Sequence, residues 1–133
     1  MRRVLDTNIA VAAMNGVPAV RSRLSEIKPE DVGIPMVGVA ELVYGAHASQ
    51  RHDKNLERVA ALRQAVQTLP LTEPVVNRYG ATRAALRSRG IVKSDFDLII
   101  ASTALEADAV LVTDDRALLD GTIAGLRVEN WLA

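Results

Sequence analysis

Short apolar runs alternate along this chain with longer stretches whose apolar residues recur at helical spacing. The short runs are typical of buried strands, and the longer stretches are typical of the helices that connect parallel strands. The pattern therefore predicts an α/β fold with a mainly parallel sheet. The predicted strands are residues 3–5, 32–36, 67–71, 109–113 and 126–128.

Several predicted helix ends carry their own signals. Thr72 precedes Pro74 and indicates a helix start, Gly90 indicates a stop, and Ser94 three residues before Asp97 resembles a capping box with the shorter acid. The polar segment 49–53 is predicted to be an exposed loop. The predicted helices are residues 9–14, 19–27, 38–48, 54–66, 74–89, 95–107 and 116–119.

Length and composition limit the class of protein. A chain of 133 residues with 49% hydrophobic content is expected to form a single globular domain over residues 1–133. The first acid follows only two apolar residues, and no stretch is long enough to span a bilayer, so we expect a cytoplasmic protein without membrane contact. With no cysteine and two histidines, any metal must be held mainly by oxygen. Sixteen basic and sixteen acidic residues cancel, so net charge does not indicate the substrate.

Four acidic positions stand out from apolar surroundings. Asp6 and the pair Asp114 and Asp115 directly follow predicted strands, and ligands of open parallel sheets bind beyond the carboxyl ends of strands. Glu41 and Asp97 interrupt apolar helices, where an unpaired charge would be costly to bury. If the fold gathers these acids, their mutual repulsion favours a divalent cation, and a carboxylate-rich, all-oxygen pocket suits Mg²⁺ or Mn²⁺.

Each acid alone also has an ordinary structural explanation. Asp6 could serve merely as the N-cap of the next helix, and Asp97 could merely be an acid in the first turn of its helix, where the helix dipole stabilises a negative charge. Glu41 could be a solvated helix residue, and Asp114 with Asp115 could form a turn. What favours a common site is that one α/β topology would bring all four positions together.

The acidic motifs, taken in order, resemble the PIN domain, and more narrowly the VapC-type toxins of type II toxin–antitoxin modules. The resemblance spans essentially the whole chain, and it implies a three-layer α/β/α fold around a central sheet of about five strands. One departure is Arg116, because the family often has an aromatic residue shortly after the fourth acid. The motifs that carry the resemblance are residues 6–8, 40–45, 97–101, 111–115 and 125–131.

Transferred residue by residue, the resemblance implies roles for particular side chains. It implies that Asp6, Glu41 and Asp97 are the principal catalytic and metal-binding acids, and that Asp115 matches the fourth position. Asp114 is adjacent and could substitute for it. The supporting polar positions are Asn8 and Thr113, which would orient a carboxylate or a metal-bound water. Whether Asp95 also contacts metal stays open.

The resemblance further implies a Mg²⁺-dependent endoribonuclease that cleaves structured RNA such as tRNA or rRNA, is inhibited by a cognate VapB-type antitoxin, and forms a homodimer. Trp131 belongs either to such a dimer contact or to the core. An acidic pocket repels phosphate, so RNA binding should depend on basic residues around it, although each could equally belong to a solvated helix face. The candidates are Arg51, Lys54, Arg58 and Arg63, and a second group of Arg83, Arg87, Arg89 and Lys93.

Two other classes of function fit the same acids. A magnesium-dependent phosphatase or phosphotransfer domain also places aspartates at strand ends, but it usually needs a catalytic lysine, and no lysine here follows a strand in the expected way. A non-catalytic module could use the acids to hold a structural cation or a basic partner. It would bind Mg²⁺ or its partner without cleaving RNA.

Overall fold

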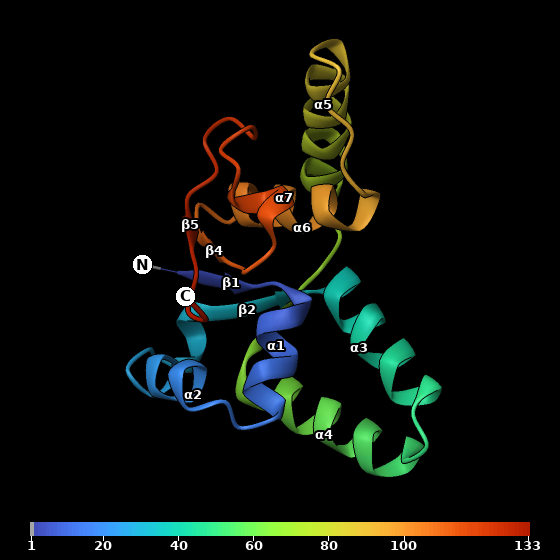
Figure 1. Ribbon diagram of the computed structural model, residues 1–133, viewed down its shortest axis with the longest axis vertical. Helices are drawn as coiled ribbons and strands as arrows, with labels where there is room; N and C mark the ends of the chain where they lie inside the picture. Colours follow the sequence, from blue (N-terminus) through green and yellow to red (C-terminus); the bar gives the residue numbers. More distant parts are fainter. Residues whose placement is uncertain (1) are drawn as a thin grey trace.

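The structure, a computed structural model, describes residues 2–133 and contains a five-stranded parallel sheet in the order β3-β2-β1-β4-β5 (Figure 1). This confirms the predicted α/β architecture and its parallel sheet. β1 pairs with both β2 and β4, so the strand that ends at Asp6 is central. The strands are β1 (Arg3–Leu5), β2 (Val32–Pro35), β3 (Gln67–Leu69), β4 (Val110–Val112) and β5 (Val128–Glu129).

Helices cover both faces of the sheet. In Figure 1 the helices α1 to α4 lie below the sheet and the helices α5 to α7 lie above it. A short 3-10 turn, η1 (Pro29–Asp31), leads into β2. The α-helices are α1 (Thr7–Met14), α2 (Pro18–Ser25), α3 (Met36–Ala48), α4 (His52–Ala65), α5 (Glu73–Ser88), α6 (Asp95–Glu106) and α7 (Arg116–Leu119).

The two-residue period of the strands divides the core between the two faces. Leu5 and Val112 pack into the cluster beneath α1 to α4, whereas their neighbours Val4 and Leu111 pack into the cluster beneath α5 to α7. Successive strand side chains point to opposite faces, so a sheet covered on both sides needs continuous apolar runs. Trp131 is buried in the first cluster, which assigns it to the core of the chain.

Most helix ends follow the predicted signals. Thr72 and Ser94 cap α5 and α6 through their hydroxyls, and Gly90 has a positive φ of 73° just after α5. The prediction of a loop through residue 53 was wrong, because α4 already begins at His52, where Asp53 in its first turn favours the helix dipole. The predicted strand 126–128 is displaced, since β5 covers Val128–Glu129.

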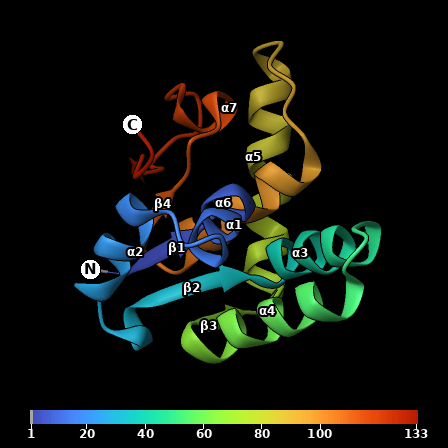
Figure 2. The same ribbon diagram turned by 60° about the horizontal axis from the view of Figure 1, so that its bottom comes forward.

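The strands lead directly into the helices that cover the sheet (Figures 1 and 2). In Figure 2, β1 and β2 lie side by side and α3 begins where β2 ends. α3 then packs against α4 and also contacts α6. Within residues 2–133, no helix has both the length and the apolar character needed to cross a membrane.

Gly33 lies so close to the side chain of Leu69 that no larger residue fits at this position without a shift. A Cβ at this position would lie 2.8 Å from Cδ1 and 2.9 Å from Cγ of Leu69, so Gly33→Ala should lower the free energy of unfolding by about 1–3 kcal/mol. Gly80→Ala is the matched control: nothing lies within 4 Å of the added Cβ, and the helix should gain up to about 1 kcal/mol. Urea denaturation of both variants measures the difference. Equal stabilities would contradict this packing.

Candidate active site

Asp6 lies at the carboxyl end of the central strand and is fixed on both carboxylate oxygens. Oδ1 accepts a hydrogen bond of 2.9 Å from the Ile9 backbone N–H, which caps α1, and Oδ2 accepts one from the Thr113 hydroxyl. The residue is only 5% exposed. Burial raises the pKa of Asp6 above its ordinary value, and the nearby charges of Asp114 and Asp115 raise it further, whereas the two hydrogen bonds act in the opposite direction.

Glu41 and Asp97 are contributed by α3 and α6, which pack against each other. Glu41 Oε1 accepts a 2.6 Å hydrogen bond from the Thr7 hydroxyl, so this acid is anchored to the first turn of α1. Asp97 lies in the first turn of α6, where its backbone N–H donates to Ser94 Oγ at 3.1 Å. Burial raises the pKa of Asp97, and the charges of Asp115 and Glu41 raise it further. These three acids are therefore close enough to repel one another.

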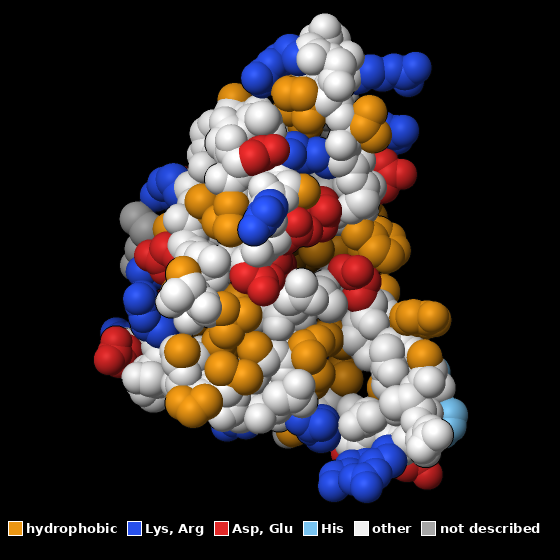
Figure 3. Space-filling model, viewed as in Figure 1, with side chains coloured by type: hydrophobic (Ala, Val, Ile, Leu, Met, Phe, Trp, Pro, Cys, Tyr) orange, Lys and Arg blue, Asp and Glu red, His pale blue; other side chains and the backbone are white. Residues whose placement is uncertain are grey.

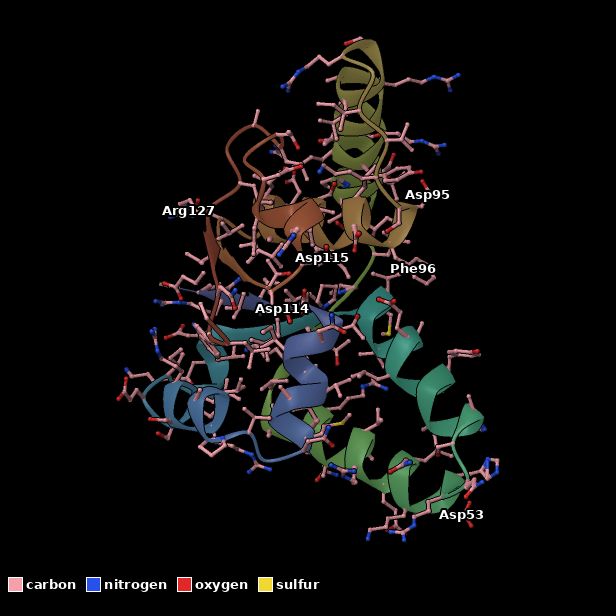
Figure 4. The ribbon with its side chains drawn as sticks, viewed as in Figure 1. Asp53, Asp95, Phe96, Asp114, Asp115 and Arg127 are labelled. Carbon is pink, nitrogen blue, oxygen red and sulfur yellow. The ribbon has the colours of Figure 1, made fainter. Side chains whose placement is uncertain are left out.

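Asp114 and Asp115 follow β4 and face the start of α1. Asp115 caps α7 by accepting a 2.9 Å hydrogen bond from the Ala117 backbone N–H. Asn8 Nδ2 donates to Asp114 Oδ1 at 3.4 Å, which is a weak contact. Figure 4 shows Asp114 and Asp115 in the space between α1 and α7. The sheet therefore brings together acids that are far apart in the sequence.

Figure 3 shows how charged side chains are distributed over one face of the molecule. Several acidic side chains gather near its middle, among hydrophobic ones and beside basic ones, and further basic side chains lie over α5 and over α4. Glu41 and Thr7 also line a cavity of about 240 Å³ between α1, α3 and α4. Two larger cavities, of about 580 and 570 Å³, contain none of the candidate acids, so volume alone does not identify the site.

The donor set suits a hard cation, although it is not arranged as a closed cage. Among residues 2–133, no three Asp, Glu or His side chains stand so that they could hold one ion together. Asp6, Asp115 and Glu41 each accept a hydrogen bond from the protein on one carboxylate oxygen. Mg²⁺ keeps several of its waters and usually takes only one or two carboxylates, so this acidic cluster is compatible with such an ion.

Some residues expected near the acids have other partners. Asp95 points away from Asp114 and Asp115 in Figure 4, where it accepts a 2.8 Å hydrogen bond from Tyr79 and pairs with Arg83 at 3.2 Å. Lys93 is not on the rim, because its side chain is 3% exposed and its ammonium contacts Ala117 O and Asp120.

Some of the basic residues expected to bind RNA also have partners within the protein, and others are exposed. Arg58 is half-buried and its guanidinium binds the carbonyl oxygen of Met14 and, at 2.8 Å, Asn15 Oδ1, which closes the end of α1. By contrast, three candidates are plainly exposed on α5 and around the start of α4: Arg51, Lys54 and Arg87. Arg63 and Arg89 are also exposed, but they contact Thr68 at 3.3 Å and the Thr122 carbonyl oxygen at 3.3 Å.

Sequence reasoning missed the contact of Thr7 with the cluster, and it assigned Lys93 to RNA binding although its ammonium binds within the protein. Thr7 was considered only as part of a motif, yet its hydroxyl binds Glu41 across 34 positions of sequence. Its place directly after Asp6, in the first helical turn, is a signal that could have found it. The inward direction of Lys93 has no comparable signal, because a lysine between two helices is usually solvated.

Comparison with known proteins identifies the class that this fold and acidic cluster define. The model of the PIN domain matches residues 3–121. The chain therefore belongs to the PIN-domain family, whose nucleases are in general metal-dependent.

Relatives then narrow the class. The chain is 32% identical to Ribonuclease VapC1 of Haemophilus influenzae, with 96% of each chain covered. It is 30% identical to the tRNA(fMet)-specific endonuclease VapC of Shigella flexneri, with 98% of each covered. The solved VapBC-1 of nontypeable Haemophilus influenzae superposes with a TM-score of 0.89 at 30% identity and complete coverage of both chains. Within the PIN family, this chain is a ribonuclease of the VapC type.

Proposed function

We propose that this ribonuclease is the Mg²⁺-dependent toxin of a toxin–antitoxin pair and that it hydrolyses phosphodiester bonds within structured RNA. The single observation that supports this most is the convergence of Asp6, Glu41, Asp97 and Asp115 at one edge of the sheet, with raised pKa values for Asp6 and Asp97. Carboxylates that repel one another at neutral pH are stabilised by a divalent cation. Mn²⁺ should substitute for Mg²⁺ because both prefer oxygen ligands.

Within this proposal, the acids hold the cation and the neighbouring polar groups hold the acids. Asp6 and Asp97, whose pKa values are raised by burial, would be the first ligands, with Glu41 and Asp115 completing the site directly or through water. Thr113, Thr7 and Asn8 fix the orientations of Asp6, Glu41 and Asp114 through their hydrogen bonds. When bound, the ion supplies an activated water and stabilises charge on the phosphoryl and leaving oxygens.

The proposed substrate is RNA in the size class of tRNA or rRNA. The relative from Shigella flexneri is described as specific for tRNA(fMet), and we extend only the class of substrate to this chain. Arg51 and Lys54 near the start of α4 and Arg87 on α5 are exposed. Basic side chains are seen over both of these helices in Figure 3. Contacts of this kind position the phosphate backbone and weaken as salt increases. Lys93 and Arg58 are not included, because their cationic groups already bind within the protein.

The proposed partner is a VapB-type antitoxin, and the proposed assembly is a homodimer with antitoxin bound. Support for the partner comes from the solved relative, which is described as VapBC-1 and which this chain matches over its full length. A basic side chain of the antitoxin that reached the acidic cluster would neutralise the same repulsion that the cation relieves. Antitoxin binding and Mg²⁺ binding should then compete.

The proposed activity is tested with purified chain freed of antitoxin. Cleavage of a tRNA pool should appear with Mg²⁺ or Mn²⁺ and stop in excess chelator, because the carboxylates alone provide no activated water. Gel analysis of end-labelled RNA should show a few discrete products, as expected for an endonuclease. Cleavage that persists in chelator would contradict the metal-dependent mechanism. Cation binding without any RNA cleavage would instead favour the non-catalytic module.

A further inference from the structure

Lys93 has a buried side chain that links the segment before α6 to α7, and these two helices begin at members of the acidic cluster or beside them. It lies between α5 and α6, four residues before Asp97, and its side chain is only 3% exposed. Its ammonium donates to the backbone carbonyl oxygen of Ala117 and, at 2.8 Å, to Asp120 Oδ2. Ala117 lies within α7 and Asp120 follows it directly. The side chain of Lys93 thus connects the segment before α6 with α7 and with the residue that follows α7.

This contact is well defined because a buried ammonium needs partners. Burial of an unpaired charge is costly, and here the charge is met by one carboxylate and one carbonyl oxygen. Asp120 is itself oriented, since its Oδ1 accepts hydrogen bonds from the backbone N–H and the hydroxyl of Thr122, at 3.0 and 2.6 Å. The ammonium of Lys93 and these two donors hold the pKa of Asp120 well below its usual range. The arrangement leaves Lys93 little freedom.

The elements that Lys93 joins are those that carry two mutually repelling acids. Asp97 lies in the first turn of α6, and Asp115 caps the start of α7. The charge of Asp115 raises the pKa of Asp97, so the two carboxylates are neighbours. α7 consists of residues Arg116–Leu119 only, so it has little hydrogen bonding of its own to keep it in place. The contacts of Lys93 with Ala117 and Asp120 are therefore suited to keep α7 close to α6, and so to keep Asp115 close to Asp97.

We propose that Lys93 is a positioning residue that fixes the spacing between Asp97 and Asp115 and thereby sets the affinity of the cluster for a divalent cation. The proposal rests on the metal-dependent function above, and it adds a residue that does not itself contact metal or RNA. It replaces the expected role of Lys93 in RNA binding with a role inside the protein.

The direct test is Mn²⁺ binding by the purified, antitoxin-free chain, measured by the electron paramagnetic resonance of free Mn²⁺. Lys93→Met keeps the apolar stem and removes both contacts, and it should weaken Mn²⁺ binding by about tenfold. Cleavage at saturating Mn²⁺ should recover toward the parent rate, because no ligand has been lost. Lys93→Arg keeps a cation that reaches Asp120 and should restore most of the affinity.

Two further variants separate positioning from general stability. Arg78→Met removes a more exposed ion pair, the 2.6 Å contact with Glu106 that links α5 and α6, and should leave the affinity for Mn²⁺ unchanged. Asp120→Asn changes an exposed residue, should fold normally, and should weaken binding in the same direction as Lys93→Met. A double variant that combines Lys93→Met with Asp120→Asn should bind Mn²⁺ no more weakly than Lys93→Met alone, because both substitutions remove the same contact.

The outcomes distinguish this inference from the proposed function. Parent-like Mn²⁺ affinity in both Lys93→Met and Asp120→Asn would overturn the positioning role and leave the metal site intact. A parent chain that binds no Mn²⁺ would overturn the metal site and the positioning role together. If Lys93→Met fails to fold, Asp120→Asn and Lys93→Arg decide the question.

Discussion

Asp97→Asn should reduce RNA cleavage by about a hundredfold or more, because it removes one of the principal carboxylates of the proposed metal site. The backbone N–H of residue 97 keeps its bond to Ser94, so the cap of α6 survives the change. Initial rates on a tRNA substrate at saturating Mg²⁺ measure the effect. Asp95→Asn is the matched control on the same helical turn, since Asp95 faces Tyr79 and Arg83, and its cleavage rate should stay within about twofold of the parent.

The same variant should be more stable than the parent in the absence of metal. The pKa of Asp97 is raised in the folded protein, so at neutral pH its ionised form is less favourable folded than unfolded. Asparagine removes this penalty and should raise Tm at pH 7. The difference should shrink as pH falls through the raised pKa and vanish below the ordinary value of 3.8, where the parent carboxyl is protonated in both states. A variant that lost activity and stability together would indicate misfolding, and one that cleaved at the parent rate would remove Asp97 from the site.

Thr113→Val should produce the second large effect, because one buried hydroxyl serves two of the acids. Thr113 is fully buried, and its Oγ1 donates to Asp6 Oδ2 and accepts from the Asp115 backbone N–H at 3.0 Å. Valine has nearly the same shape but leaves both groups without this partner, which should cost about 1–3 kcal/mol of unfolding free energy. Loss of the donor also raises the pKa of Asp6 further and frees its carboxylate to rotate. Cleavage should fall about ten- to a hundredfold.

Two controls identify the hydroxyl as the cause. Thr113→Ser keeps the oxygen and should retain most of the activity. Thr103→Val removes another buried hydroxyl, which binds only the Ile99 carbonyl oxygen of its own helix at 2.8 Å, and should leave cleavage unchanged. Chemical denaturation and cleavage rates are compared across the three variants. Parent-like behaviour of Thr113→Val in both measurements would show that Asp6 does not depend on this bond.

Local sequence signals predicted the frame of the site but not its fine contacts. The strand pattern predicted that Asp6 and the pair Asp114 and Asp115 lie at one edge of the sheet, because parallel strands bring their carboxyl ends together, and this depends only on the alternation of apolar runs. Their hydrogen-bond partners depend on rotamers and on distances between segments far apart in the chain, which no local pattern encodes. For the same reason no local signal decided whether Asp95, two positions before Asp97, also belongs to the site, although the helix directs the two side chains to different neighbours.

The contacts of the basic residues were also not predictable from local sequence. A lysine and an arginine have long, flexible stems, so composition and periodicity predict solvent exposure for both. Lys93 and Arg58 instead reach carbonyl oxygens at or near the ends of other helices, Ala117 in α7 and Met14 in α1. Only the packed structure reveals that these helix ends lie within reach. Predictions of RNA-binding residues from sequence are therefore least secure where a cation is near a helix terminus.

The pairing of β1 with β4 has a consequence for protein synthesis. The acids it brings together are separated by more than a hundred positions, from Asp6 to Asp115, and neither neighbour of β1 alone completes the cluster. A nascent chain that has not yet emerged past Asp115 lacks one wall of the site. Formation of the acidic cluster on a nascent chain must therefore wait until β4 and Asp115 have left the ribosome, even if the segments before them have already folded.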